Sequence, residues 1–340
     1  MFMPHPALRR DHLAARLLAL VLLALVASGG ACGGGSTSTP PPLNLPAFDS
    51  ARAFADLVAQ CEFGPRNPGS AGHDAQLEWM KTQLNPLAGR VVLQPFTTAT
   101  AFGGPYDFVN VIAAFGEGQP GPITMLAAHW DTRPVADEDP LEANQNTPIL
   151  GANDGASGVA ILLELARVFH AQPPPHPVYL VFLDAEDSGK GGASGIYMGY
   201  CLGAAHLAQN WPAELPPPAR GILLDLVGGV AKHDARLPLK PGVHDAFYMP
   251  TEGNSLTSDR AFVLAIWAMA ERVGATAFSL DAGQPVIDDH MPFIGVGIPT
   301  VDIIQFPVPV WHTVDDTPEY CSASALAQVG KTLLGVIFND

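Results

Sequence analysis

The chain has 340 residues, of which 48% are hydrophobic and only 15% are charged, and its formal net charge is −16. This composition excludes a disordered chain and leaves enough apolar residues for a sizeable core. Only 17 residues are lysine or arginine, so the chain lacks the clustered positive charge that phosphate binding needs, and we expect no nucleic-acid partner.

The N-terminal segment predicts export. Arg9, Arg10 and Arg16 precede an apolar stretch over residues 17–27, and small residues follow it up to Cys32. The apolar stretch is shorter than the roughly 20 residues that a transmembrane helix needs. Cys32 after small residues is typical of a bacterial lipoprotein cleavage site. We therefore expect an exported protein, either a cell-envelope lipoprotein on the periplasmic or cell-surface side or a secreted protein.

A Gly-, Ser-, Thr- and Pro-rich stretch follows Cys32 and is typical of a flexible tether. Secretion without a lipid, an uncleaved anchor and twin-arginine export remain as alternatives. The predicted organisation is a signal peptide over 1–31, a lipidated cysteine with its tether over 32–46, and a single folded domain over 47–340.

Export also permits disulfides, and three cysteines remain after Cys32: Cys61, Cys201 and Cys321. An odd number leaves at least one of them unpaired. The spacing does not choose among the three pairs, and free buried thiols are an equal alternative.

From residue 48 onward, patterns typical of helices alternate with short apolar runs. The runs predict strands at 91–94, 108–115, 123–128, 179–183, 221–224 and 300–304. The helical patterns lie at 51–61, from about 72 onward, and at 155–169, 258–273 and 325–338. Asp49 or Ser50 is expected to cap the first of these helices, and Ser324 the last. This alternation predicts a three-layer α/β/α sandwich with a mixed, mostly parallel central sheet.

Acidic residues and histidines stand where several of these apolar runs stop. Open α/β sheets bind ligands beyond the carboxyl ends of their strands, so these side chains are expected to converge there. Carboxylates and imidazoles together are typical ligands of a catalytic zinc ion. The candidates are His129, Asp131, Asp154, Glu186, Asp187, Asp225 and His312.

Taken singly, most of these residues have simpler explanations. The His129-x-Asp131 pair at a strand end can be structural, Asp154 can cap a helix, and Glu186 and Asp187 can be solvated loop charges. Asp225 is more informative, because an acid inside an apolar run needs a partner or a cation. The common placement of all these residues at strand ends favours a shared site.

The motifs resemble those of the M28 zinc aminopeptidase family, and within it those of the glutaminyl-peptide cyclotransferases, or glutaminyl cyclases. The resemblance extends from residue 48 to the C-terminus, which makes 47–340 a single catalytic domain with a zinc exopeptidase-like fold. It rests on AHWDTRP at 128–134, GANDGASG at 151–158, LDAEDSG at 183–189, LLDLVG at 223–228, DDHMPF at 288–293 and VWHTVDD at 310–316.

This resemblance implies one zinc ion per chain, held by Asp154, Asp187 and His312. It implies an enzyme that converts the N-terminal glutamine of peptides or proteins to pyroglutamate and releases ammonia, with Glu186 as the acid/base residue. Asp225 and Asp288 would be hydrogen-bonded partners of Glu186. His129 and Asp131 would bind a second metal or support the site. Trp311, Phe306 and His290 would form the walls of the substrate pocket. A monomer is expected, with membrane contact only through the lipid anchor.

Two other functions stay open. In an M28 aminopeptidase, His129 and Asp225 would join Asp154 around a second zinc, and Glu186 would activate a water between the two metals. The third hypothesis is a surface lipoprotein that keeps the fold as a binding module and has lost catalysis. Two departures from the vertebrate cyclotransferases stand out: Ala128 replaces a disulfide-forming cysteine, and the loop over 189–200 does not align with their tryptophan-bearing loop.

Overall fold

The computed structural model describes residues 43–191, 197–229 and 247–339. The predicted signal peptide, Cys32 and most of the predicted tether lie outside these ranges. Among the described helices, none combines the length and the hydrophobicity needed to cross a membrane.

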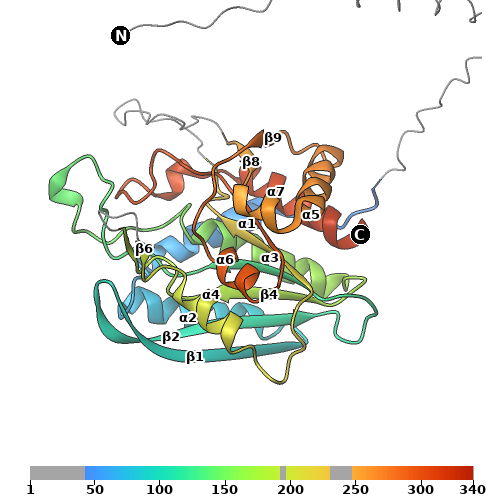
Figure 1. The fold of residues 1–340 in the computed structure, drawn as a ribbon, viewed down its shortest axis with the longest axis horizontal. Coiled ribbons are helices and arrows are strands. Elements are labelled where there is room, and N and C mark those ends of the chain that lie inside the picture. The colour runs from blue at the N-terminus through green and yellow to red at the C-terminus, as the bar shows by residue number, and fades with distance from the viewer. Residues whose placement is uncertain (1–42, 192–196, 230–246, 340) are drawn as a thin grey trace, which may run out of the picture. The chain divides into compact units, whose positions relative to one another are not determined.

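A six-stranded mixed sheet forms the centre of the domain, with the strand order β1-β2-β4-β3-β7-β10 (Figure 1). Strands β4, β3, β7 and β10 run parallel, whereas β2 is antiparallel to both of its neighbours. The prediction of a mixed, mostly parallel sheet is confirmed. The strands are β1 (Arg90–Thr100), β2 (Gly103–Phe115), β3 (Thr124–His129), β4 (Val178–Leu183), β7 (Arg220–Asp225) and β10 (Thr300–Ile304).

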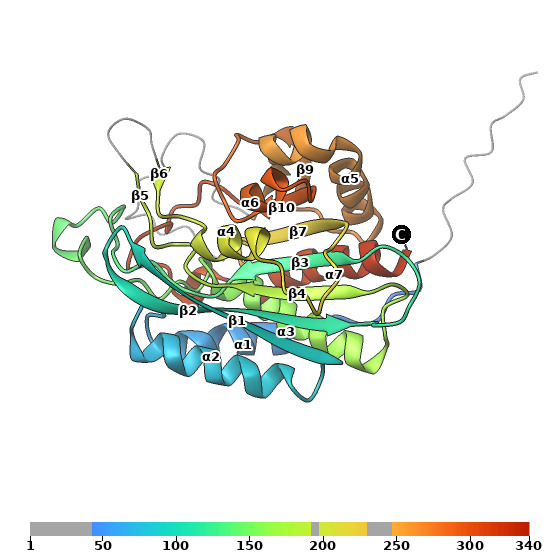
Figure 2. The ribbon, with the colours of Figure 1, turned by 60° about the horizontal axis from the view of Figure 1, so that its bottom comes forward.

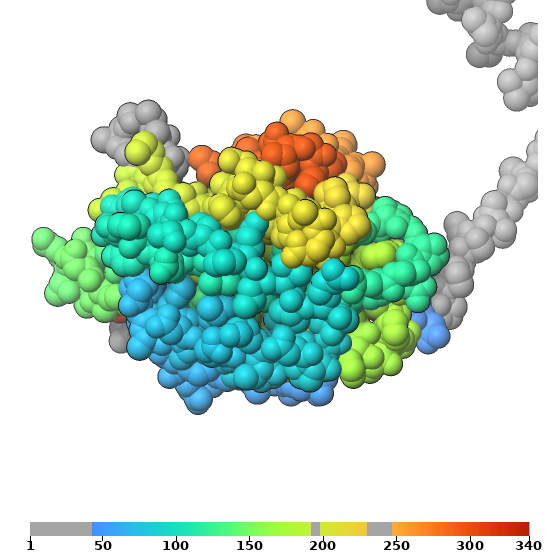
Figure 3. All heavy atoms as spheres, turned by 90° about the horizontal axis from the view of Figure 1, so that it is seen from below, coloured from blue at the N-terminus to red at the C-terminus, as the bar shows by residue number. Residues whose placement is uncertain are grey.

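Burial explains how clearly each strand is visible in the sequence. All residues of β3 and β4 are buried, and these strands read as continuous apolar runs because helices cover both faces. Strand β1 lies at the edge of the sheet and is largely exposed, and the hairpin that it forms with β2 runs across the surface in Figure 3. Its polar residues hid the true length of the strand, so the predicted 91–94 was too short.

Helices cover the two faces of the sheet, as Figure 2 shows. On one face lie α1 (Ser50–Glu62), α2 (Ala71–Leu84), α3 (Ala156–Ala171) and α7 (Ala323–Asn339), and on the other lie α4 (Leu202–Gln209) and α6 (His290–Gly295). Helix α5 (Gly253–Arg272) packs against β10 and α7. The remaining short elements are η1 (Glu142–Asn144), β5 (Lys190–Gly191), β6 (Tyr197–Met198), β8 (Met249–Thr251), β9 (Phe278–Ala282) and η2 (Pro318–Tyr320).

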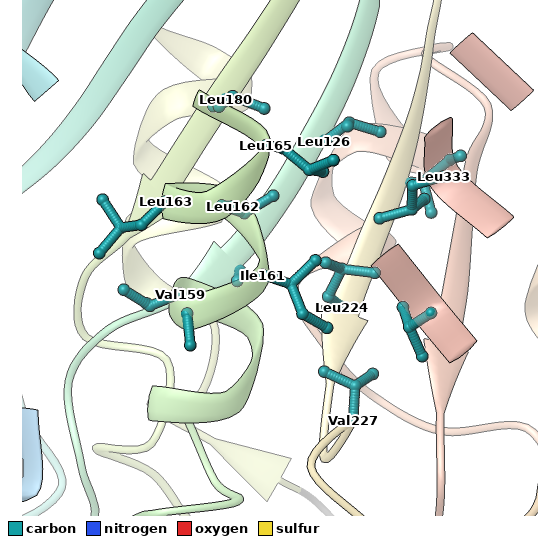
Figure 4. Packing of buried hydrophobic residues seen from close by; sticks show 14 of the residues in the cluster. Leu126, Val159, Ile161, Leu162, Leu163, Leu165, Leu180, Leu224, Val227 and Leu333 are labelled. Atoms are coloured by element: carbon teal, nitrogen blue, oxygen red, sulfur yellow. The ribbon is translucent and has the colours of Figure 1, made fainter. Parts of the chain in front are cut away.

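The larger core cluster forms around α3, which is apolar on nearly every side. Leu162, Leu163 and Leu165 are fully buried, and they pack with side chains of the sheet and of α7, such as Leu224 and Leu333 (Figure 4). A helix that is hydrophobic all round is stable only in such a position. The start of α3, beside the ends of the parallel strands, is thereby held firmly in place.

Two predicted helix starts need correction. Ser324 lies inside α7, and the neighbouring Ser322 accepts the hydrogen bond from the Ala325 N–H instead. Helix α5 begins at Gly253, where Glu252 accepts hydrogen bonds from the first backbone N–H groups, and it is kinked at the non-helical residue Asp259. The predicted helix over 258–273 matches the part after this kink, where the Asp259 carboxylate accepts from the Phe262 N–H, and the helical turns before the kink were not predicted. The cap of the first helix by Asp49 is confirmed, since its carboxylate accepts from the Arg52 N–H.

Cys61, Cys201 and Cys321 are all free thiols. Of the alternatives left open by the sequence, the structure therefore has unpaired cysteines and no disulfide among these three. Cys201 and Cys321 are buried, whereas Cys61 is partly exposed.

Candidate active site

The parallel strands bring the candidate residues to one edge of the sheet. Strand β3 ends at His129 and β7 ends at Asp225, while Glu186 and Asp187 lie in the loop that begins after Leu183, the last residue of β4. The loop after β10 returns to the same edge and carries His312. Asp154 and His312, 158 residues apart in the sequence, therefore have side-chain atoms 3.8 Å apart, because the carboxyl ends of parallel strands meet at this edge.

Asp154, Asp187 and His312 form the first cluster and are all buried, with potential ligand atoms within 4.8 Å of one another. His312 Nε2 lies 3.3 Å from Asp187 Oδ1 and 3.8 Å from Asp154 Oδ2. The Oδ2 atoms of both aspartates are buried without a hydrogen-bond partner. Two carboxylates and one imidazole nitrogen, with oxygen atoms left unpaired, fit a tetrahedral zinc ion with one open position.

His129 joins Asp154 and Asp225 in a second cluster. His129 Nε2 lies 3.2 Å from Asp154 Oδ1 and 3.2 Å from Asp225 Oδ1. Burial by itself would lower the pKa of His129, but Asp131, Asp154 and Asp225 around the ring raise this pKa well above its ordinary value. The concentration of negative charge suits a cation, so this donor set could also hold a metal.

Asp131 belongs to neither cluster and supports the main chain instead. Its carboxylate accepts hydrogen bonds from the backbone N–H groups of Glu186, at 3.0 Å, and Asp187, at 3.2 Å. Its Oδ1 atom also lies 3.5 Å from His129 Nδ1. Of the two predicted roles for Asp131, the geometry fits the supporting one.

Two charged residues that the sequence analysis missed hold the first cluster from outside. Arg133 donates to Asp187 Oδ1 at 2.9 Å and makes two hydrogen bonds to the Asp137 carboxylate. Asp137 in turn lies 3.5 Å from Nδ1 of His312. This carboxylate fixes the ring orientation, so Nε2 of His312 faces the cluster.

Glu186 directly precedes Asp187 of the first cluster and lies in an acidic, buried environment. Burial and the neighbouring carboxylates of Asp187, Asp288 and Asp289 raise the pKa of Glu186 well above its ordinary value. Burial and Asp225 similarly raise the pKa of Asp288 to about 7. The thiol of Cys201, which the sequence analysis did not place in the site, donates to Glu186 Oε1 at 3.6 Å. A carboxyl group with this proton affinity suits acid/base chemistry near neutral pH.

A pocket of about 320 Å³ opens onto these carboxylates and is lined by Asp225, Asp288, Phe306 and Trp311, among others. The ring of Trp311 stacks on His312 at 3.8 Å and meets Phe306 edge to face at 5.0 Å. The pocket is therefore lined by aromatic rings and by carboxylates.

His290, predicted as a pocket wall, is not among the residues that line this pocket. Its side chain is fully buried beneath the site, with Nε2 3.4 Å from Glu252 and Nδ1 3.7 Å from Asp302. His290 starts α6 and points into the fold, which the sequence could not show.

Four non-glycine residues with positive φ lie at or next to the site: Ala185, Cys201, Leu226 and His312. Among the described residues there are no others. Such conformations cost on the order of 1 kcal/mol or more each and persist where the surrounding structure enforces them. Their concentration here indicates that the positions of Glu186, Asp225 and His312 are held against local backbone preference.

The alternative role of Asp154 as a helix cap is also excluded. Gly155 is the N-cap of α3, and the Asp154 carboxylate makes no capping hydrogen bond. Gly155 has φ +98°, and a Cβ atom there would lie 2.8 Å from the Asp131 carbonyl oxygen. Glycine is therefore required, and Asp154 is directed toward the two histidines.

Comparisons with known proteins find relatives over most of the described domain. The model of peptidase family M28 matches residues 110–337, which is more than half of the chain. The glutaminyl-peptide cyclotransferase-like protein of Mus musculus is 31% identical over 284 residues, covering 74% of this chain. The alignment spans 66% of that relative, just under two thirds of its length.

Solved structures are similar over most of the chain. Bacteroides thetaiotaomicron glutaminyl cyclase, solved with N-acetylhistamine bound, has 33% sequence identity and a TM-score of 0.78, covering 87% of this chain and 100% of that one. A leucine aminopeptidase precursor from the same organism has 33% identity and a TM-score of 0.79, covering 88% and 99%. The fold thus occurs in proteins of both descriptions.

Proposed function

The chain belongs to peptidase family M28, and we propose that it is a zinc-dependent glutaminyl-peptide cyclotransferase that converts N-terminal glutamine to pyroglutamate with release of ammonia. The observation that carries this proposal is that Asp288, which lines the small pocket together with Trp311 and Phe306, has a ligand atom within 4.8 Å of one of Glu186, the residue directly before Asp187 of the first cluster. A pocket of this size suits one glutamine side chain folded back on its own amine.

The chemistry needs a residue that first accepts and then donates a proton. Glu186 takes a proton from the α-amine of the substrate as this amine attacks the γ-carboxamide carbon. The same carboxyl group then gives the proton to the departing amide nitrogen, which leaves as ammonia. Its raised pKa, caused by burial and by the acidic neighbours, suits both steps.

The remaining groups position the reactants. Trp311 and Phe306 enclose the folded side chain and exclude water, and Asp225 and Asp288 face the pocket beside Glu186. Because nucleophile and electrophile belong to one residue, correct folding of the substrate supplies much of the rate advantage. We assign the zinc ion to Asp154, Asp187 and His312, where it would polarise the carboxamide carbonyl.

An aminopeptidase is the second candidate, and a specific observation favours it. The cluster of His129, Asp154 and Asp225 lies beside the first cluster and shares Asp154, as a two-metal site would. The similar fold of the leucine aminopeptidase precursor supports the same alternative. The tryptophan directly before His312 and the acidic pair Asp288-Asp289 favour the cyclotransferase, with one zinc per chain.

The deciding experiment incubates the protein with a Gln-initiated and a Leu-initiated peptide, follows both by mass spectrometry, and measures zinc stoichiometry in the same sample. Loss of ammonia from the Gln peptide with the Leu peptide intact and one zinc per chain is expected. Removal of the first residue from the Leu peptide, with two zincs, would replace the proposal by the aminopeptidase. His129→Ala should then lower the metal content from two to one, whereas the one-zinc enzyme would keep its metal.

Glu186→Gln tests the assigned acid/base residue. Turnover should be lost while zinc remains bound, because Glu186 is not among the three assigned ligands. Glu214→Gln is a matched control at an exposed glutamate and should leave both quantities unchanged. Retained turnover in Glu186→Gln would contradict the assignment.

We further propose that the protein is exported and attached to the cell envelope through a lipidated Cys32, with a tether up to residue 46 and the catalytic domain over 47–340. The charged, apolar and small-residue segments before Cys32 support this arrangement. Metabolic labelling with a fatty acid should mark the wild-type protein and fail to mark Cys32→Ala. A monomer is the proposed state in solution, which light scattering would test.

A further inference from the structure

The thiol of Cys201 lies next to the proposed acid/base residue and has no part in the reaction described above. Its sulfur is 3.6 Å from Glu186 Oε1. Both residues are buried, with exposed fractions of 4% for Cys201 and 8% for Glu186. Sulfur and carboxylate oxygen at this separation are within the span of two ligands on one metal ion, given bond lengths of about 2.3 Å for Zn–S and about 2.0–2.2 Å for Zn–O.

The fold enforces this contact. Cys201 has φ 56° and ψ 31°, which is the left-handed region that a cysteine rarely adopts. The conformation is held by two backbone hydrogen bonds, from the Cys201 N–H to the Glu186 carbonyl at 2.9 Å and from the Leu202 N–H to the Ala185 carbonyl at 3.0 Å. The thiol is thus fixed against the residue that carries the chemistry.

A third donor completes the group. Asp288 is only 3% exposed, and its Oδ1 accepts the hydrogen bond from the Asp289 N–H, whereas its Oδ2 is buried without a partner. Ligand atoms of Glu186, Cys201 and Asp288 all lie within 4.8 Å of one another. Asp288 also lines the open pocket, which gives a small ion a route to the group.

We propose that Cys201, Glu186 and Asp288 form an inhibitory site for an additional thiophilic divalent cation, such as Zn²⁺ or Cd²⁺ supplied in excess. One thiolate and two carboxylates leave a fourth position open toward the pocket, as in other three-ligand sites. The thiol proton is released to solvent when the metal–sulfur bond forms. A hard ion such as Mg²⁺ prefers oxygen ligands and is excluded by the sulfur.

Occupation of this site would stop the reaction. An ion bound to Glu186 takes the lone pair with which this carboxylate accepts the amine proton. The site differs from the cluster of His129, Asp154 and Asp225, with which it shares no residue. The inhibitory effect rests on the cyclotransferase function proposed above, whereas metal binding itself does not.

The test titrates Cd²⁺ into the full chain carrying its own zinc. Ultraviolet absorption reports cadmium–thiolate charge transfer, and ammonia release from a Gln-initiated peptide reports activity. The first assigned cluster has no sulfur, so exchange of its ion gives no such band. We expect a charge-transfer band that rises together with inhibition in the wild-type protein.

Two substitutions separate the site from other effects. Cys201→Ser keeps a hydrogen-bond donor toward Glu186 but removes the soft ligand, and Cys201→Ala removes both. In each variant the charge-transfer band from this site should disappear. The Cd²⁺ concentration that halves the variant's own activity should rise about tenfold or more, because even the loss of an outer-sphere partner weakens metal affinity by about 10–100-fold. Cys321→Ala removes another buried thiol and should leave the titration unchanged.

An unchanged charge-transfer band in Cys201→Ser and Cys201→Ala would overturn the proposed site. Equal inhibition of all variants would overturn its inhibitory role. Circular dichroism of each variant establishes that it is folded. If the protein lacks cyclotransferase activity, the absorption titration still decides whether Cys201 binds the ion, so the two proposals fail separately.

Discussion

Replacing Asp131 by asparagine tests whether this residue holds the loop that carries Glu186 and Asp187. In the structure, its two carboxylate oxygens accept one backbone N–H each, from Glu186 and from Asp187. Asparagine has only one acceptor oxygen, and its NH₂ group would face the second N–H donor. One fully buried N–H group would lose its partner.

The structure allows an estimate of the cost. An unsatisfied buried donor costs about 1–3 kcal/mol, and the surviving hydrogen bond loses about 1 kcal/mol when its acceptor is no longer charged. Asp131→Asn should therefore lower the free energy of unfolding by about 2–4 kcal/mol, or the melting temperature by roughly 5–10 °C. Zinc affinity should fall about 10–100-fold, because Asp187 is no longer held in place.

Urea unfolding of the metal-free protein, followed by circular dichroism, measures the first quantity, and competition with a chelator measures the second. Asp74→Asn is the matched control, because the Asp74 side chain is 87% exposed. It should change neither the free energy of unfolding nor the zinc affinity. If Asp131→Asn unfolds within about 0.5 kcal/mol of the wild-type protein and keeps its zinc affinity, the supporting role assigned to Asp131 is refuted.

Burial by itself raises the pKa of Glu252, but hydrogen bonds from His290 and from backbone N–H groups outweigh burial and lower this pKa from 4.5 to about 2. The ionised Glu252 therefore stabilises the folded protein above about pH 4.5, and this stabilisation is lost as the pH falls toward 2. The stability difference between wild type and Glu252→Gln, measured by urea unfolding, should thus shrink between about pH 5 and pH 2, and a constant difference would contradict this. Leu162→Ala should cost about 2–5 kcal/mol in the same assay because the side chain is fully buried in the core, and a loss under 1 kcal/mol would show that the core readily collapses around the gap. Ser70→Ala removes the cap of α2, where the hydroxyl accepts from the His73 N–H at 3.1 Å, and should cost about 1 kcal/mol; no loss would mean that water replaces the cap. Chelation of the metal should lower the melting temperature and added zinc should restore it, unless the clustered carboxylates are stable without a cation.

The part of the fold that the sequence predicted well is the part buried on both sides. Strands β3 and β4 and helix α3 read as continuous apolar segments because no face of them meets solvent, and hydrophobic burial depends directly on residue type. The full length of the exposed strand β1 and the turns of α5 before its kink at Asp259 were not predicted. Their limits depend on pairing with β2 and on the cap by Glu252, which are not properties of residue type.

The candidate site divides in the same way. Strand ends and motif resemblance predicted Asp154, Asp187 and His312 as one group, and the structure brings these side chains together. Arg133 stood within a quoted motif but received no role, because its contact with Asp187 spans 54 residues. Cys201 gave no signal at all beyond the cysteine count.

His290 shows the limit most clearly. Its motif placed it near the site, but only the packing of α6 determines that the ring points down toward Glu252 and Asp302 rather than into the pocket. The sequence by itself determined the fold class, the sheet edge at which the site forms, and the residue types available for metal binding and proton transfer, because these follow from hydrophobic periodicity and side-chain chemistry. The tertiary structure alone decided which atoms face one another, because contacts such as that of Cys201 with Glu186 depend on left-handed backbone turns and on hydrogen bonds between distant segments.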